Sequence, residues 1–285
     1  SPGIADKRWV YRQYDHMVRL GTLERPGDAD AAVLRLPGSK RMLAVCVDGN
    51  SVHVKLDPFG GAQGIIAEAC RNLACTGAQA IGATDCLNFG NPERPDVMWE
   101  FEQAVLGLGE GLRQAHVPIV SGNVSFYNET GEQSIHPTPT IGMVGLIEAG
   151  VSPLGMALPS AGSLVLLGSP RPVLGGSAYA RVIHDSEQGM PPQVYWSEEL
   201  ALHQLLREAA QRGLLLAAHD LSEGGLATSL AEMLISSRGK ASGCQIQVPC
   251  PPSAEAVELS LFGETHGCAW VAVEDERRAE LLALC

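Results

Sequence analysis

The stretches ATDCLNFGNPE, at residues 83–93, and PIVSGNVSFYNETG, at residues 118–131, decide the predicted fold. Each begins with apolar residues typical of a strand and continues into glycine and short side chains that carry oxygen. The first predicted strand ends at Asp85, and the second leads to Gly122 and Asn123. Because open sheets place ligands at the carboxyl ends of their strands, the two stretches predict a ligand site where neighbouring strands end.

The residue types at these strand ends suit magnesium and phosphate. Asp48 follows a third apolar run, so three strand ends in one region carry an oxygen ligand. Oxygen ligands without His or Cys suit Mg²⁺ rather than zinc, and Mg²⁺ usually arrives with phosphate. Gly122 lets the backbone approach a phosphate, while Asn123 and Ser125 offer an amide oxygen and a hydroxyl. The alternative is that Asp and Asn start turns after strands, and the pattern leaves both interpretations open.

Glycine-rich segments elsewhere are candidates for a phosphate contact. The segment HDLSEGG, at residues 219–225, lies between a predicted strand and a predicted helix, with Ser222 as a possible cap. Gly175-Gly176-Ser177 opens another predicted helix, and a helix N-terminus attracts anions. A well-capped connection without a ligand is the alternative for each segment.

A helix is predicted over residues 6–18, and it carries a histidine. His16 would be credible as a general base. The pattern nevertheless favours a surface histidine paired with Asp15 or Arg12, and no residue of the chain is assigned as catalytic.

The spacing of apolar residues predicts an α+β fold. Amphipathic helices are expected at residues 61–75 and 96–115, the second with Asp96 as its N-cap. The strands expected around them cover residues 31–36, 42–48, 80–85, 118–120 and 140–147.

Residues 149–162 are rich in Gly, Pro, Ser and Ala and have no clear period, as in a linker. We therefore expect one domain at residues 1–150 and a second, truncated α/β domain at residues 151–285. The second domain is expected to have strands at residues 164–168, 214–219, 245–248 and 268–273, and helices at residues 174–184, 198–212 and 223–236.

Composition narrows the class of protein. A length of 285 residues predicts about two domains. A net charge of −12 argues against a nucleic-acid partner, but not against a small anionic ligand. The sequence has no apolar run long enough for a membrane span, and no signal peptide is visible. The eight cysteines form no CxxC pair. We therefore expect a cytoplasmic protein with reduced thiols. Because the chain begins at Ser1 and ends within a predicted helix, we treat it as a piece of a longer polypeptide.

Read together, five stretches resemble one family over essentially the whole chain. They look like the second half of the phosphoribosylformylglycinamidine synthases, the synthetase component of formylglycinamide ribonucleotide amidotransferase, within the aminoimidazole ribonucleotide synthetase superfamily. The two stretches quoted first are long and specific to this family. The others are WVYRQYDHMV at residues 9–18, PTPTIGMVGLIE at 137–148 and AHDLSEGGLATSLAEM at 218–233.

The resemblance implies an ATP-dependent carbon–nitrogen ligase of purine biosynthesis. Such an enzyme phosphorylates the formyl amide oxygen of formylglycinamide ribonucleotide with ATP and Mg²⁺, giving an iminophosphate. Ammonia from a glutaminase domain or subunit then displaces phosphate, giving the amidine. The implied partners are the first half of the synthetase, the glutaminase and a small accessory subunit, with no nucleic acid and no membrane.

The family's architecture also implies roles for single residues. Each half has an N-terminal α+β domain and a C-terminal α/β domain, and the two N-terminal domains join their sheets into a barrel. The catalytic histidines lie in the first half. Positions matching Asp85 and Gly122 contact the nucleotide, a position matching Asn123 is a metal ligand, and one matching Ser125 contacts the substrate.

Two other interpretations stay open. The half could be a non-catalytic structural partner with a degenerate nucleotide-binding pseudo-site. The chain could also belong to another ATP-using enzyme of the superfamily, such as selenophosphate synthetase or thiamine-phosphate kinase, although those families do not share the NFGNPE and NVSFYNET wording.

Overall fold

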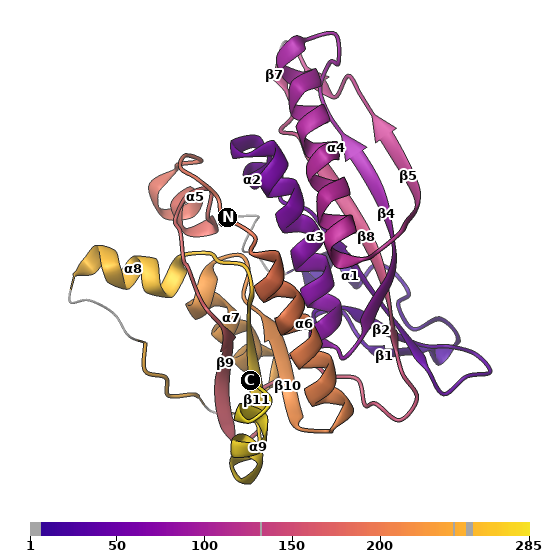
Figure 1. Ribbon diagram of the computed structural model, residues 1–285, viewed down its shortest axis with the longest axis vertical. Helices are drawn as coiled ribbons and strands as arrows, with labels where there is room; N and C mark the ends of the chain where they lie inside the picture. The colour runs from indigo at the N-terminus through magenta and orange to yellow at the C-terminus, as the bar shows by residue number, and fades with distance from the viewer. Residues whose placement is uncertain (1–6, 132, 242, 249–252) are drawn as a thin grey trace.

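The computed structural model describes residues 7–131, 133–241, 243–248 and 253–285 (Figure 1). A mixed sheet of six strands dominates the first half of the chain, in the order β1-β2-β3-β8-β4-β5. Neighbouring strands are antiparallel except for β4 and β5, which are parallel. The strands are β1 Thr22–Glu24, β2 Ala32–Arg35, β3 Met42–Asp48, β8 Thr138–Ile147, β4 Gln79–Asn88 and β5 Ile119–Ser125. A short hairpin, β6 Glu129–Thr130 and β7 Gln133–Ser134, follows β5.

Helices cover one face of this sheet (Figure 1). They are α2 Ser51–Leu56, α3 Pro58–Cys75 and α4 Pro95–Ala115. Asp57 caps α3 by accepting a hydrogen bond from the Gly60 N–H at 3.0 Å, and Pro58 fits the first helical turn. The predicted cap of α4 is wrong by two residues: Arg94 is the N-cap, because Pro95 begins the helix and places Asp96 in its first turn.

The two faces of the sheet differ in cover. Along β8, alternate residues such as Ile141 and Met143 are fully buried beneath the helices, as the two-residue period of a strand requires. On the opposite face β3 and β8 carry partly exposed apolar side chains, and Val47 of β3 is 72% exposed. This half of the chain therefore keeps an apolar sheet face that its own helices do not bury.

The second half contains a three-stranded sheet in the order β10-β11-β9, from β10 Leu215–Asp220, β11 Cys268–Val273 and β9 Ser163–Gly168. Both pairings are antiparallel. The sequence predicted an α/β domain, but an antiparallel sheet makes this domain α+β. The predicted strand at residues 245–248 is not formed; Ile246 and Val248 pack on the core without entering the ladder. The helices are α5 Ala178–His184, α6 Trp196–Gln211, α7 Gly225–Ser236, α8 Ala254–Phe262 and α9 Arg278–Leu282, with a 3₁₀ turn η2 at Asp275–Arg277.

The predicted helix over residues 6–18 is mostly absent. Residue 6 lies outside the described residues, α1 covers only Arg8–Tyr11, and a 3₁₀ turn, η1, follows at Val18–Leu20. The Asp15 carboxylate accepts a hydrogen bond from the Met17 N–H at 2.7 Å, a local contact that competes with helical hydrogen bonding. Among the helices in the described ranges, none has both the length and the apolar character that crossing a membrane would require.

Candidate functional site

The fold brings the two deciding stretches side by side. Strands β4 and β5 pair in parallel register, with Asp85 opposite Gly122, Cys86 opposite Asn123, and Asn88 opposite Ser125. The predicted strand ends were too early, because β4 continues to Asn88 and β5 to Ser125. Pairing with β8 on one side and with each other supplies backbone hydrogen bonds for these polar residues, so the strands extend through them.

Asp85 and Gly122 occupy the face of the sheet on which the helices pack. A Cβ built on Gly122 would stand 2.4 Å from Asp85 Oδ1, so the carboxylate crosses directly over this glycine. The Asn123 N–H donates to the same Oδ1 at 3.2 Å. Burial raises the pKa of Asp85 above its ordinary value, and the hydrogen bond from Asn123 offsets only part of that increase.

Asn123 and Ser125 point to the opposite face, since side chains alternate along a strand. The amide nitrogen of Asn123 lies 4.0 Å from the Cys86 sulfur, and the Ser125 hydroxyl accepts from Asn128 Nδ2 at 3.2 Å. The remaining side chains of the pair on this face are uncharged: Thr84, Cys86, Asn88 and Ser121. The four predicted residues thus form two pairs on two faces, and Asn123 offers a metal one oxygen without a neighbouring carboxylate on this strand pair.

Strand β5 lies at the margin of the sheet. It pairs only with β4 within the described residues, and all its side chains except Ser125 are exposed. Its second backbone edge is open, which makes it a template for a further strand.

The predicted phosphate cradles hold a carboxylate instead. Glu264 Oε1 accepts the N–H of Gly224, the N-cap of α7, at 2.9 Å and the N–H of Ala178 at the start of α5 at 2.7 Å. A carboxylate is favourable at a helix N-terminus for the same reason as a phosphate. Ser222 does not cap α7, because the cap is Gly224 at a φ of 75°.

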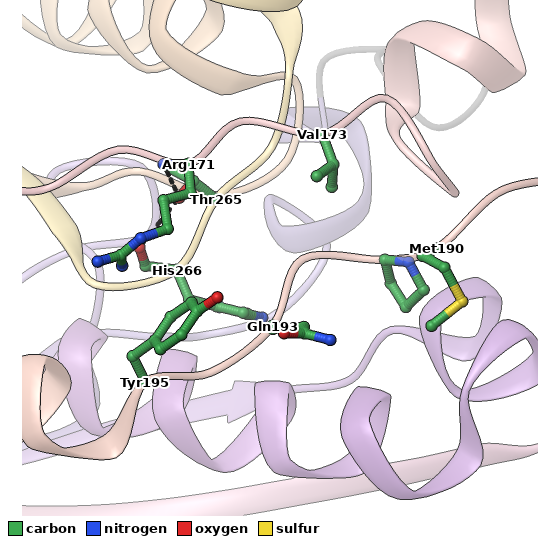
Figure 2. Close-up of a pocket in the computed structure, with 8 residues that line it drawn as sticks. Arg171, Val173, Met190, Gln193, Tyr195, Thr265 and His266 are labelled. Carbon is green, nitrogen blue, oxygen red and sulfur yellow. Dashed lines mark hydrogen bonds between the residues drawn. The ribbon is translucent and has the colours of Figure 1, made fainter.

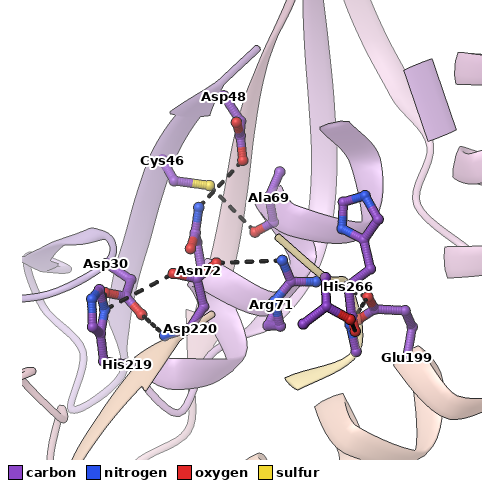
Figure 3. A network of polar contacts seen from close by, with 12 residues as sticks. Asp30, Cys46, Asp48, Ala69, Arg71, Asn72, Glu199, His219, Asp220 and His266 are labelled. Atoms are coloured by element: carbon purple, nitrogen blue, oxygen red, sulfur yellow. Dashed lines mark hydrogen bonds and ion pairs between the residues drawn. The ribbon is translucent and has the colours of Figure 1, made fainter. Parts of the chain in front are cut away.

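A buried polar network joins the two halves through α3 (Figure 3). Arg71 is fully buried; its Nη1 donates to Glu199 Oε1 of α6 at 2.7 Å and its Nη2 to Asp220 Oδ2 of β10 at 3.4 Å. Burial alone would raise the pKa of Glu199, but the Arg71 charge and a hydrogen bond with His203 lower it to about 2. The Glu199 carboxylate is therefore ionised, and it also accepts the Gly267 N–H at 2.6 Å.

An acidic cluster, which we define as Asp48, Glu68 and Asp220 with Asn72, lies beside this network. The Asn72 amide donates to Asp48 Oδ2 at 3.3 Å. Burial and the negative charge of Asp220 raise the pKa of Asp48 to about 7, and burial and Asp48 raise that of Glu68. Burial also raises the pKa of Asp220 to about 6, with the charge of Asp30 adding to the effect. The carboxylates are hard oxygen donors with excess negative charge, the kind of ligand that Mg²⁺ prefers, although the oxygens of Asp48, Glu68 and Asp220 do not all lie within 4.8 Å of one another.

Sequence reasoning missed two of the four residues of this cluster, Glu68 and Asn72. Asp48 was recognised as a strand-end oxygen ligand, and Asp220 belongs to the HDLSEGG segment. Glu68 and Asn72 are four residues apart, so they share one face of α3, but that spacing is also common on solvated helices. The topology, rather than any local motif, brings them to residues of two other strands.

His219 extends the cluster into an ion-paired bridge. Its Nδ1 lies 2.6 Å from Asp30 Oδ1 and its Nε2 lies 3.1 Å from Glu232 Oε2. Burial would lower the pKa of His219, but Asp30 and Glu232 raise it well above the usual value. Asp30, His219 and Asp220 place ligand atoms within 4.8 Å of one another, yet both imidazole nitrogens already have carboxylate partners. The geometry favours a protonated bridge over a histidine metal ligand.

A separate cavity of about 220 Å³ lies among the loops of the second half, and Figure 2 shows its lining. The Arg171 guanidinium lies 4.2 Å from the centroid of the Tyr195 ring and forms two hydrogen bonds with Glu198, at 2.7 and 2.8 Å. His266 is neutral, because burial and the Arg71 charge lower its pKa to about 3. None of the predicted site residues lines this cavity.

Comparison with family models accounts for both halves of the chain. Residues 28–147 match AIR synthase related protein, N-terminal domain, and residues 161–285 match AIR synthase related protein, C-terminal domain. The chain belongs to the AIR synthase related family. This confirms the resemblance found in the sequence and the two-domain α+β fold that it implied.

Two curated relatives show which members of the family the chain is similar to. Phosphoribosylformylglycinamidine synthase subunit PurL of Anaeromyxobacter dehalogenans strain 2CP-C is 44% identical over 296 residues, covering 99% of this chain and 38% of the relative. PurL of Alkaliphilus metalliredigens strain QYMF is 49% identical over 236 residues, covering 82% and 32%. The chain thus spans less than two fifths of the length of the curated relatives it matches.

A solved structure shows the same fold. Thermotoga maritima PurL complexed with FGAR matches with a TM-score of 0.66 and 23% identity, covering 95% of this chain and 37% of that chain. The same protein has been solved with ATP and as PurLQS.

Proposed function

We propose that this chain is the C-terminal part of the ATP-dependent ligase that converts formylglycinamide ribonucleotide and glutamine-derived ammonia to formylglycinamidine ribonucleotide. The observation that carries the proposal is the 44% identity to a PurL subunit across 99% of the chain. The solved complexes of T. maritima PurL with FGAR and with ATP support these two as substrates. The reaction runs through an iminophosphate in de novo purine synthesis, in the cytoplasm.

Within that reaction, the β4–β5 pair supplies contacts rather than a catalytic group. We assign Asn123 to Mg²⁺ and Ser125 to the ribonucleotide, because both point to the same face of the sheet. We assign Asp85 and Gly122 to ATP, placed at the open edge of β5, where a ligand reaches both faces. Mg²⁺ supplies charge neutralisation in phosphoryl transfer when bound. The carboxylates missing beside Asn123 then come from outside the β4–β5 pair.

The first half of the synthetase completes the site in this proposal. Its N-terminal domain pairs a similar sheet with the domain at residues 1–150, closing a barrel over the exposed face that includes Val47. The domain at residues 151–285 packs behind it. The glutaminase and a small accessory subunit are the expected partners for ammonia supply, in line with the solved PurLQS.

Replacing Asn123 with Ala in the complete synthetase tests the assignment. The side chain is exposed, so we expect little change in thermal unfolding but at least a tenfold loss in kcat/KM for ATP, about 1.4 kcal/mol of transition-state stabilisation. Ser121→Ala, two residues away on the same face, is the matched control and keeps wild-type kinetics. Ser125→Ala acts mainly on kcat/KM for the ribonucleotide. Wild-type constants in Asn123→Ala refute the metal role, and an unfolded variant indicates a turn-forming role instead.

The acidic cluster favours a second function within the same protein, a nucleotide-binding pseudo-site that stabilises the fold. Its carboxylates repel one another and are internal to this chain, so a magnesium nucleotide would relieve them without the other half. Mg²⁺ with ADP should raise the Tm of the isolated chain, and Glu68→Gln should abolish the increase. An equal increase in Tm in the wild-type chain and in Glu68→Gln refutes this second role.

A further inference from the structure

A cavity of about 370 Å³ lies where the N-terminal segment meets the end of α7, and basic side chains dominate its lining. Three stretches of chain contribute: α1 with the turn after it, the loop before β2, and Arg238, the second residue after α7. Its polar lining consists of Arg8, Tyr11, Arg12, His16, Arg25 and Arg238.

This concentration of positive charge contrasts with the rest of the protein. The chain has a net charge of −12, yet four of its 20 lysines and arginines surround one cavity, and no carboxylate is among the lining residues within the described ranges. Three acidic residues belong to the same stretches of chain, and Asp30 among them pairs with His219. Asp28 pairs with Arg238, and Asp15 accepts a backbone hydrogen bond from Met17.

Two of the arginines that line the cavity can bind a ligand without breaking an ion pair that the structure describes. Among the described residues, the structure pairs neither Arg12 nor Arg25 with a carboxylate. Like charges held around one hollow create a local positive potential that attracts an anion. Tyr11 and His16 add a hydroxyl and an imidazole to the same wall, with their ring centroids 6.2 Å apart in an edge contact.

We propose that this cavity binds a small phosphate-bearing anion. Guanidinium groups present planar pairs of donors that match phosphate oxygens. The volume exceeds that of a bare phosphate ion and lies within the range of small-molecule sites, so the ligand is a phosphorylated metabolite rather than the ion alone.

The site is distinct from the proposed active site. Arg8, Arg12 and Arg25 precede residue 28, where the match to the N-terminal family model begins, while Arg238 lies within the C-terminal match. None of the lining residues belongs to β4, β5 or the acidic cluster. A bound phosphate would therefore tie the N-terminal segment to the second half of the chain.

Calorimetric titration of the chain tests the proposal, with EDTA present so that no metal-bridged phosphate contributes. The probes are inorganic phosphate, ribose 5-phosphate and ribose. The cavity variant is Arg12→Gln/Arg25→Gln, and the matched control is Arg35→Gln/Arg41→Gln, which removes the same charge from exposed positions on and beside β2 and β3. Circular dichroism confirms that each protein is folded.

We expect both phosphates to bind saturably and ribose not to bind. The cavity variant should bind at least tenfold more weakly, about 1.4 kcal/mol, while the control binds as wild type does. If the double variant does not fold, Arg12→Gln and Arg25→Gln singly carry the test, each expected to weaken binding about threefold.

Three results overturn the proposal. One is the absence of saturable phosphate binding up to about 10 mM. Another is an equal loss in the control, which would show attraction by overall charge. The third is binding of poly-glutamate without binding of either phosphate, which would indicate an acidic protein partner. None of these results bears on Asn123, so the proposed ligase function stands or fails separately.

Discussion

Replacing Arg71 with Met should destabilise the protein more than any exposed substitution. The change keeps a long, unbranched side chain but removes the positive charge between Glu199 and Asp220, which lie 2.7 and 3.4 Å from its nitrogens. Removing one partner of a buried ion pair costs about 3–5 kcal/mol, because the other charge stays buried and unpaired. At about 2–4 °C per kcal/mol for a chain of this size, the Tm should fall by roughly 6–20 °C.

The pH dependence should change as well. In the wild type the pKa of Glu199 is lowered to about 2, below its ordinary value of 4.5. Its contribution to stability is therefore present above pH 4.5 and is lost as the pH falls towards 2. Without Arg71, burial dominates and raises the pKa of Glu199, so the variant should gain stability relative to wild type as the pH falls from neutral.

Urea unfolding followed by circular dichroism at pH 7 measures the difference. Arg207→Met on α6 is the matched control: this arginine is half-buried but has no carboxylate partner among the described residues, so its loss should stay within about 1 kcal/mol. Arg71→Met/Glu199→Gln should recover part of the stability, because it removes one unpaired charge. An Arg71→Met protein within about 1 kcal/mol of wild type refutes the reasoning.

Three further predictions concern the two sites. Without divalent cations the folded protein holds more protons on Asp48 and Asp220 than the unfolded chain does between about pH 4 and 7. Scanning fluorimetry should therefore show the Tm falling as the pH rises through this range, and Mg²⁺ should raise the Tm at pH 7.5 but not at pH 5. Gly122→Ala places a Cβ against Asp85 and should lower stability by about 1–3 kcal/mol in urea unfolding, whereas Gly243→Ala, which meets nothing within 4 Å, should not. The purified chain should make no amidine from ATP, ammonia and formylglycinamide ribonucleotide in a product assay, and steady turnover would show that a catalytic group has been missed.

Local patterns were enough to predict α3 and α4, the two long helices of the first half, but not α2. The apolar spacing of residues 61–75 identified α3, although its start at Pro58 depends on the cap at Asp57. The helix expected over residues 6–18 failed because Asp15 bonds to nearby backbone, a contact that periodicity does not register. Likewise, Ile246 and Val248 alternate as in a strand, yet they reach the core without a pairing partner.

The site was harder to predict because it depends on register and on distant residues. The polar residues at the predicted strand ends indicated that Asp85 and Asn123 lie close together. Only the register of β4 with β5 shows that their side chains point to opposite faces of the sheet. The glycine-rich turns suggested phosphate, and Glu264, about 40 residues from Gly224 and farther from Ala178, supplies a carboxylate to both. Such contacts leave no local trace in the sequence.

The position of each site within the chain makes the two proposed roles separable. Asn123 lies on an edge strand, so whatever surrounds it must come from outside the six-stranded sheet. Asp48 and Asp220 belong to the two halves of this same chain and meet beside α3, so their charge repulsion exists whether or not another half is present. Ligase activity should therefore require the complete protein, whereas cation-dependent stabilisation should appear in this chain alone. If both properties required the complete protein, the acidic cluster would not be formed by these 285 residues as the structure describes it.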